Sequence, residues 1–204
     1  MDSNGDEYST LRTSARASLT VRGSKFLAQA APAAGKSECE ELLRQAKKEY
    51  HDATHNCFAY RLAPDGAQFR TGDDGEPSGT AGKPILAAID AADLIGVIVV
   101  VTRYFGGVKL GSAGLVRAYR TAAERALGAG EPLKRYLCET IGIAFPHACT
   151  GPVIRAVGTS GGRVSSSQYD REVEMQIEIR RSRAEGLRLA LLEVTSGAVR
   201  FTLR

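Results

Sequence analysis

Apolar residues in the first two-thirds of the chain recur with two different periods, and each change of period separates a strand from a helix. An unbroken run of β-branched residues from Val97 to Val101 predicts a strand buried on both faces. Residues 115–126 then carry apolar side chains at intervals of four, three and four, the spacing of one helix face. The same patterns predict strands at 17–22, 25–30, 55–60 and 68–71, and helices at 37–50 and 84–92.

The composition changes at residues 128–132, where glycine and proline predict a break between domains. Beyond it, the pattern predicts the order strand-helix-strand-strand-helix-strand, which is that of a ferredoxin-like sandwich. These elements are expected at 139–145, 146–159, 163–169, 172–179, 184–194 and 198–203. We therefore predict an α+β protein with a flexible tail at 1–14, an N-terminal domain at 15–130, a linker at 131–137 and a ferredoxin-like C-terminal domain at 138–204.

A glycine-rich junction with basic residues lies between the buried strand and the long helix. Backbone N–H groups at glycines approach a ligand closely, and the start of a helix adds partial positive charge. The junction therefore predicts an anion-binding corner, although a tight connection in which the glycines only permit close packing explains the same residues. The spacing is that of neither a Walker A loop nor a dinucleotide fingerprint. The residues concerned are Arg103, Gly106, Gly107, Lys109, Gly111, Gly114, Arg117 and Arg120.

Charge and cysteine content narrow the class of protein. A net charge of +4 permits an anionic partner such as RNA without requiring one. The four cysteines form no CxxC pair, so neither a zinc site nor a disulfide framework is expected. The first residues lack the apolar segment of a signal peptide, and no apolar run reaches the length of a membrane span. We expect a soluble cytoplasmic protein without a membrane partner, metal or cofactor.

Residues of catalytic type gather in two places. His51 and His55 have the spacing of a zinc-binding helix, but the alternation after His55 predicts a strand instead. On a strand, His55 and Cys57 share a face, so they are either a base beside its nucleophile or a packed thiol beside a hydrogen-bonded histidine. Three carboxylates lie in the Gly/Pro-rich loop 73–76, which either binds a cation and transfers protons or is a solvated acidic loop.

Three blocks of the chain together resemble the recurring segments of the IMPACT family. They are HNCFAYR from His55, DDGEPSGTAGKPIL from Asp73 and VVVTRYFGGVKLGSAGLVRAYRTAA from Val99. The resemblance implies an N-terminal α/β domain like the second domain of a small-subunit ribosomal protein and domain IV of elongation factor G. It implies a ferredoxin-like domain after it, like domain V of the same factor, and a role in the regulation of translation.

The resemblance also implies a functional surface in which the glycine-rich corner adjoins a cleft formed by the other two blocks. Lysine and arginine would neutralise phosphates there, and the amides of Gly106 and Gly107 would hold an oxygen. The implied residues are Arg103, Tyr104, Lys109 and Arg117 at the corner, with His55, Asn56, Arg61, Asp73, Asp74, Glu76 and Lys83 in the cleft.

From these observations we expect a non-enzymatic, translation-associated regulator. It would bind RNA, the ribosome or a translation-regulatory protein through the basic glycine-rich loop. The alternative is an enzyme that acts on a small anionic substrate with the cluster of His55, Asp73, Asp74 and Glu76. A third hypothesis is an interaction module whose partner docks on the C-terminal sheet.

Overall fold

The computed structural model describes residues 5–62 and 66–202. The chain divides into two compact units, one built from Tyr8–Arg135 and the other from Tyr136 onward together with the segment up to Glu7. Each unit contains a β-sheet and α-helices, so the mixture of helices and sheets expected of an α+β protein is confirmed. None of the described helices is long and apolar enough to cross a membrane.

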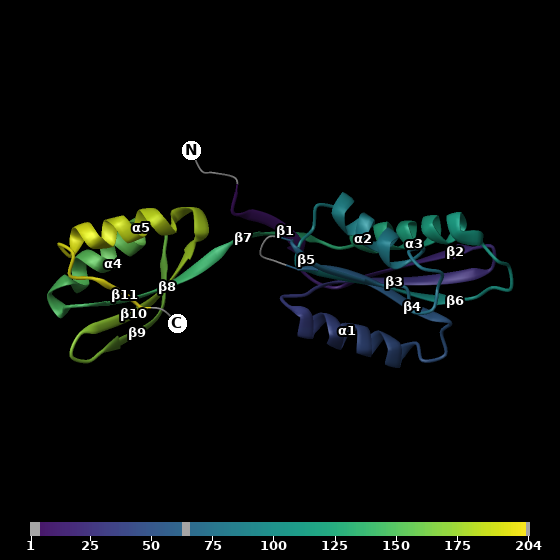
Figure 1. The fold of residues 1–204 in the computed structure, drawn as a ribbon, viewed down its shortest axis with the longest axis horizontal. Helices are drawn as coiled ribbons and strands as arrows, with labels where there is room; N and C mark the ends of the chain where they lie inside the picture. Colours follow the sequence, from purple (N-terminus) through teal and green to yellow (C-terminus); the bar gives the residue numbers. More distant parts are fainter. Residues whose placement is uncertain (1–4, 63–65, 203–204) are drawn as a thin grey trace. The chain divides into compact units, whose positions relative to one another are not determined.

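An antiparallel five-stranded sheet forms the centre of the first unit (Figure 1). Helix α1 (Lys36–Glu49) covers one face, and α2 (Gly82–Ala91) and α3 (Gly111–Gly128) cover the other. The strands lie in the order β2-β3-β6-β4-β5. They are β2 (Ala15–Val21), β3 (Ser24–Pro32), β4 (His55–Leu62), β5 (Gln68–Gly72) and β6 (Val97–Tyr104).

The central strand β6 is buried on both faces, as its β-branched run predicted. Val97, Val99 and Val101 pack in the core with α2 and α3, while the side chains between them pack under α1. Because successive side chains of a strand point to opposite faces, Arg103 continues the row that faces α2 and α3. The strand therefore carries a charged side chain to the end of an apolar core.

The second unit follows the predicted order of strands and helices around a four-stranded antiparallel sheet, β11-β8-β10-β9. Alternate residues of β10 from Val173 to Ile179 face a core closed by the two helices. The helix predicted at 146–159 is divided, because a 3-10 turn at His147–Cys149 precedes α4. The elements are β8 (Cys138–Phe145), α4 (Thr150–Thr159), β9 (Arg163–Tyr169), β10 (Val173–Arg180), α5 (Arg181–Val194) and β11 (Arg200–Thr202).

The structure differs from the sequence-based expectation at the tail and the linker. The tail contains strand β1 (Glu7–Leu11), most of the linker is strand β7 (Pro132–Tyr136), and the two strands pair as a two-stranded sheet. Leu11 is buried in the core with α2 and α3. Both segments are polar, and the pattern of neither one indicates that its backbone hydrogen bonds are made with the other. Residues 1–4 of the expected tail lie outside the described residues.

Candidate functional site

The loop between β6 and α3 forms the corner that the sequence predicted to bind an anion. Gly106 lies so close to the β2–β3 turn that a Cβ there would come within 1.9 Å of the Gly23 carbonyl carbon. The N–H of Gly106 donates to Ser24 Oγ (3.2 Å). Gly107 and Gly111 are exposed, with φ of 86° and 69°, which glycine adopts without strain. Close packing therefore explains Gly106, whereas the other two glycines shape an exposed loop.

Three basic side chains lie in or beside this loop. We call residues 105–110 together with Arg22 and Arg117 the basic corner. Lys109 belongs to the loop, Arg117 to α3, and Arg22 to the β2–β3 turn. All three are exposed, and the described part of the chain offers them no hydrogen-bond or ion-pair partner. Sequence reasoning missed Arg22, although its position directly before the glycine of a predicted hairpin turn is visible in the sequence.

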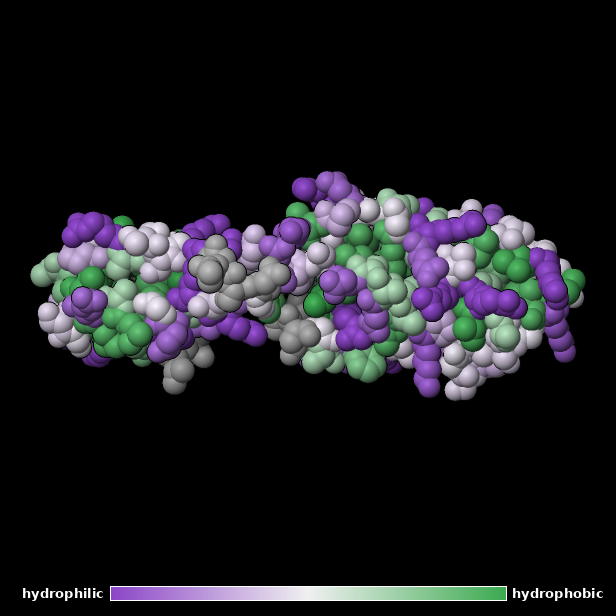
Figure 2. Space-filling model, turned by 90° about the horizontal axis from the view of Figure 1, so that it is seen from above, coloured by the Kyte–Doolittle hydropathy of each residue, from purple (hydrophilic) through white to green (hydrophobic). Residues whose placement is uncertain are grey.

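The basic corner also presents apolar surface and free backbone donors. Arg22 and Arg117 line a groove of about 260 Å³ between β2 and α3, with Leu19 and Leu110 among its apolar residues. Figure 2, which looks onto α2 and α3, shows long hydrophilic side chains standing beside hydrophobic ones on this unit. Among the described residues, no side chain caps the start of α3, so its first N–H groups and their partial positive charge remain available. The arrangement suits an anion that carries apolar groups.

Arg103, expected as an anion ligand, lies instead in the interior. Only 5% of the residue is exposed, and its Nη1 donates to Glu76 Oε1 at 2.6 Å. Its Nη2 donates to Ser24 Oγ (3.3 Å), and the guanidinium carbon lies 5.6 Å from the centre of the Phe26 ring and 5.5 Å from that of Phe105. Arg103 is therefore a positioning residue, which ties the acidic loop and the β2–β3 turn to the strand that leads into the basic corner.

Glu76 is the acceptor at the centre of this buried cluster. Its Oε1 also accepts the hydroxyl of Tyr119 (2.7 Å) and lies 3.9 Å from His55 Nε2. Sequence reasoning treated Tyr119 only as an apolar helix position. A tyrosine on a buried helix face needs a partner for its hydroxyl, however, and that need could have pointed to a polar group here. The cluster joins β6, α3, β4 and the acidic loop, so all three sequence blocks meet in it.

His55 and Cys57 share one face of β4, as predicted, but the thiol has other partners. Cys57 Sγ donates to the carbonyl of Asp73 (3.0 Å) and lies 3.4 Å from the Tyr119 hydroxyl. His55 Nδ1 lies 2.7 Å from the carbonyl of Asp74. Burial raises the pKa of Cys57 to about 12, so the thiolate needed for nucleophilic attack is scarce at neutral pH. The packed-thiol reading is the one the geometry favours.

The carboxylates of Asp73 and Asp74 are both engaged inside the protein. Asp73 accepts the N–H groups at the start of α2, from Gly79 (2.8 Å), Ala81 (3.0 Å) and Gly82 (2.8 Å). Burial acts to raise the pKa of Asp73, but these N–H donors outweigh it and hold the pKa below its ordinary value. The loop 73–76 is therefore a structural clamp on α2.

Asp74 is held in the same manner from the other side. It accepts Lys47 Nζ and the N–H of Asn56, each at 2.7 Å, and these bonds outweigh burial and lower its pKa. Asn56 is itself buried, and its Oδ1 accepts the Thr102 hydroxyl (2.6 Å). Lys83 is exposed on the first turn of α2, and its charge contributes to the lowered pKa of Asp73.

Arg61 does not join the cleft in which the resemblance placed it. His55 pairs with Arg103 across the sheet, whereas Arg61 pairs with Val97 at the opposite end of β6. Arg61 lies six positions after His55 along the strand, roughly 20 Å away. There, Arg61 Nε donates to Asp90 Oδ1 (2.6 Å).

Two further candidates are also paired away from the loop. The hydroxyl of Tyr104 donates to Asp52 (2.8 Å), which belongs to the turn after α1. Arg120 Nε donates to Glu124 (2.8 Å) on the exposed side of α3. Lys109, Arg117, Gly107 and Gly111 are thus the expected ligands at this loop that the structure leaves open to solvent. The N–H of Gly106, which was expected to hold an oxygen of the ligand, donates to Ser24 Oγ instead.

Comparison with known proteins accounts for the three sequence blocks. A family model described as the Impact N-terminal domain matches residues 22–127, which contain all three. The chain belongs to the IMPACT family. The IMPACT family member YigZ of Escherichia coli is 30% identical over 188 residues, which make up 88% of this chain and 89% of the relative. YvyE of Bacillus subtilis is 29% identical over 190 residues, 93% of this chain and 88% of the relative.

More distant relatives match about half of the chain. A Protein IMPACT homolog of Saccharomyces cerevisiae is 34% identical over 117 residues, 55% of this chain and 45% of the relative. Among solved structures, the crystal structure of a hypothetical protein aligns with a TM-score of 0.73 at 24% identity, over 98% of both chains. That likeness shows a shared fold over the described residues that align.

Proposed function

We propose that this IMPACT family member is a cytoplasmic, translation-associated regulator that binds RNA, within the ribosome or free, through the basic corner. The observation that carries the proposal is the contrast between two kinds of basic residue. Arg103 is buried against Glu76, whereas Arg22, Lys109 and Arg117 are exposed and have no carboxylate partner among the described residues. Unpaired cations beside open backbone N–H groups are what phosphate contacts require.

The family supports the connection to translation. Some relatives of this chain are named Protein IMPACT, and the resemblance of the three sequence blocks to that family implies a role in the regulation of translation. The element order of the second unit favours the ferredoxin-like class. By fold analogy, we also infer that the first unit is like a ribosomal-protein domain and domain IV of elongation factor G, as the family resemblance implies.

The internal bonds of the acidic loop favour binding over catalysis. A general acid or base needs a carboxylate that reaches the substrate. The carboxylates of Asp73, Asp74 and Glu76 each hold backbone or side-chain donors of the protein itself. Their contribution is therefore to hold the surface that carries the basic corner.

Fluorescence anisotropy of a labelled single-stranded RNA across a range of salt concentrations tests the proposal. Each phosphate contact on a single strand contributes about −0.7 to the slope of log K against log salt, so three cations give a slope of about −2. The double variant Lys109→Ala, Arg117→Ala should reduce the slope to about −0.7 and weaken binding. Lys48→Ala, Arg155→Ala removes the same charge from exposed sites elsewhere and is the control. Equal effects of the two double variants would reject the basic corner as the binding site.

A further inference from the structure

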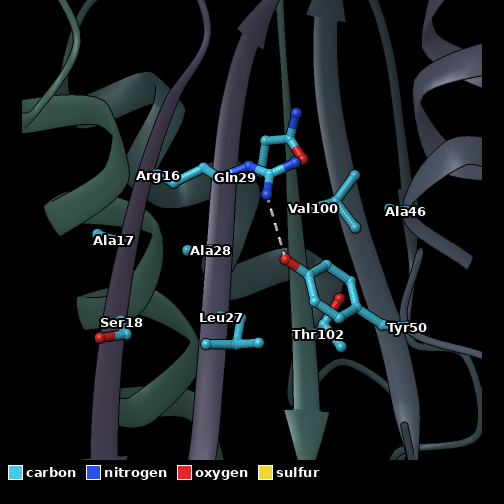
Figure 3. A pocket seen from close by; sticks show the side chains of 10 residues that line it. All are labelled: Arg16, Ala17, Ser18, Leu27, Ala28, Gln29, Ala46, Tyr50, Val100 and Thr102. Atoms are coloured by element: carbon cyan, nitrogen blue, oxygen red, sulfur yellow. Dashed lines mark hydrogen bonds between the residues drawn. The ribbon is translucent and has the colours of Figure 1, made fainter. Parts of the chain in front are cut away.

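A second cavity lies on the other face of the same sheet, beside α1 (Figure 3). It measures about 270 Å³ and is lined by strands β2, β3 and β6 and by the end of α1. Helix α1 packs against β4 and β6, so the faces of β2 and β3 form the open floor. Pockets for drug-sized ligands span roughly 300 to 1,000 Å³, so this cavity suits one smaller group.

The walls of the cavity combine flat apolar surfaces with polar groups at one end. Leu27 and Val100 rise from the floor, and the ring of Tyr50 closes the side next to α1 (Figure 3). Gln29 lies at the end opposite Leu27, and no hydrogen-bond partner for its amide exists among the residues that the structure describes. The hydroxyl of Thr102 donates to Asn56, so its oxygen can still accept a bond from a ligand.

Arg16 crosses the sheet to form the upper edge of the cavity. It is the cross-strand neighbour of Gln29, and its Nη1 and Nη2 donate to the two carboxylate oxygens of Glu49 at 2.7 and 2.8 Å. The same Nη1 lies 3.5 Å from the Tyr50 hydroxyl. Two bonds to one carboxylate hold the guanidinium plane in place. A fixed guanidinium plane, a phenol ring and a free carboxamide are the groups that stack on an unpaired base and bond to its edge.

The cavity is also close to the basic corner. Thr102 lies on β6 two residues before Tyr104, after which the loop of the basic corner begins, so the two sites are roughly 10–15 Å apart along the strand. Lys25 pairs with Tyr104 across the sheet between them. Lys25 is exposed, and within the described ranges its ammonium group has no partner. A nucleic-acid backbone on the basic corner can therefore continue past a further cation toward the cavity.

We propose that this cavity binds an unpaired nucleobase, stacked against Tyr50 and Arg16 with its polar edge on Gln29. This inference rests on the proposed function, because RNA bound at the basic corner would supply the base. A free nucleotide presents the same chemistry. Gln29 is the specificity-determining residue, because a carboxamide offers a donor and an acceptor side by side, as the edge of adenine does.

Two measurements test the cavity. In the first, adenosine monophosphate is titrated into the full chain while the Gln29 side-chain amide is followed by NMR, with ribose 5-phosphate as the probe without a base. We expect the nucleotide to shift the amide resonances and the sugar phosphate to leave them unchanged. In the second, anisotropy compares a single-stranded oligoadenylate of about six nucleotides with an abasic strand of equal length.

The variants separate this proposal from the one on which it rests. Gln29→Leu should weaken oligoadenylate binding roughly five- to a hundredfold and leave binding of the abasic strand unchanged. Gln45→Leu, an exposed glutamine on α1, is the matched control and should change neither. The double variant Lys109→Ala, Arg117→Ala should weaken binding of both the oligoadenylate and the abasic strand.

Three results can be told apart. If the nucleotide moves no amide resonance and Gln29→Leu matches its control, the cavity proposal is overturned while RNA binding at the basic corner stands. If no RNA binds but the nucleotide shifts Gln29, the cavity is a free-nucleotide site and the proposed function fails. If neither probe binds, both proposals fall.

Discussion

The buried ion pair between Arg103 and Glu76 gives the sharpest prediction about how this surface is held. The two side chains are 6% and 3% exposed, and 2.6 Å separates their charged atoms. Arg103→Met keeps a long apolar stem but removes the guanidinium, which leaves the buried Glu76 carboxylate with the Tyr119 hydroxyl as a donor and His55 Nε2 at 3.9 Å. Breaking a buried pair in this way costs about 3–5 kcal/mol. For a unit of this size the expected fall in Tm is roughly 10–20 °C.

Urea denaturation followed by circular dichroism measures that loss. Arg120→Met removes an arginine from the exposed pair with Glu124 and should cost less than about 1 kcal/mol. Adding Glu76→Gln to Arg103→Met removes the unpaired charge and should recover about 1 kcal/mol or more. Equal losses for Arg103→Met and Arg120→Met would show that the buried pair stabilises the fold no more than an exposed one. A drop of about 0.7 in the salt slope of RNA binding for folded Arg103→Met would show that Arg103 is a phosphate ligand rather than a positioning residue.

Cys57, Asp73 and Gly106 each allow a separate test. At pH 8, iodoacetamide should modify the exposed Cys138 in the native protein but not Cys57, because burial raises the pKa of Cys57 to about 12. Mass spectrometry measures both rates, and equal rates would contradict this. The pKa of Asp73 lies below its ordinary value of 3.8 in the folded protein, so the ionised carboxylate stabilises the fold above about pH 4. The Tm of the wild type should therefore exceed that of Asp73→Asn by less and less as the pH falls below about 4, and a difference that grows in acid would contradict this. Gly106→Ala should cost about 1–3 kcal/mol because its Cβ meets the Gly23 carbonyl carbon at 1.9 Å, whereas Gly128→Ala, with nothing within 4 Å, should cost nothing in the same melt.

The strands and helices of the first unit could be predicted because their signals are local. The β-branched run at Val97–Val101 and the spacing of apolar residues in α3 each lie within one element. Strands β1 and β7 were missed because each depends on a partner far away in the sequence. A polar segment shows nothing of that partner.

The three sequence blocks could be identified from the sequence, but the roles of their residues could not. An arginine beside glycines looks the same in sequence whether it meets a phosphate or a buried Glu76, and only the folded loop brings that carboxylate to Arg103. Strand alternation held a clue, since Arg103 shares its parity with the buried Val99 and Val101. Arg61 shares a face of β4 with His55, but distance along the strand separates them, which a list of motif residues does not convey.

Cosedimentation with ribosomes at low and moderate salt measures whether the basic corner binds ribosomal RNA. The wild-type protein should sediment with ribosomes at low salt, and moderate salt should reduce this binding. The double variant Lys109→Ala, Arg117→Ala should abolish the binding, whereas Lys48→Ala, Arg155→Ala should retain it. Binding that resists salt, or that survives in the basic-corner variant, would contradict the assignment of function to this surface.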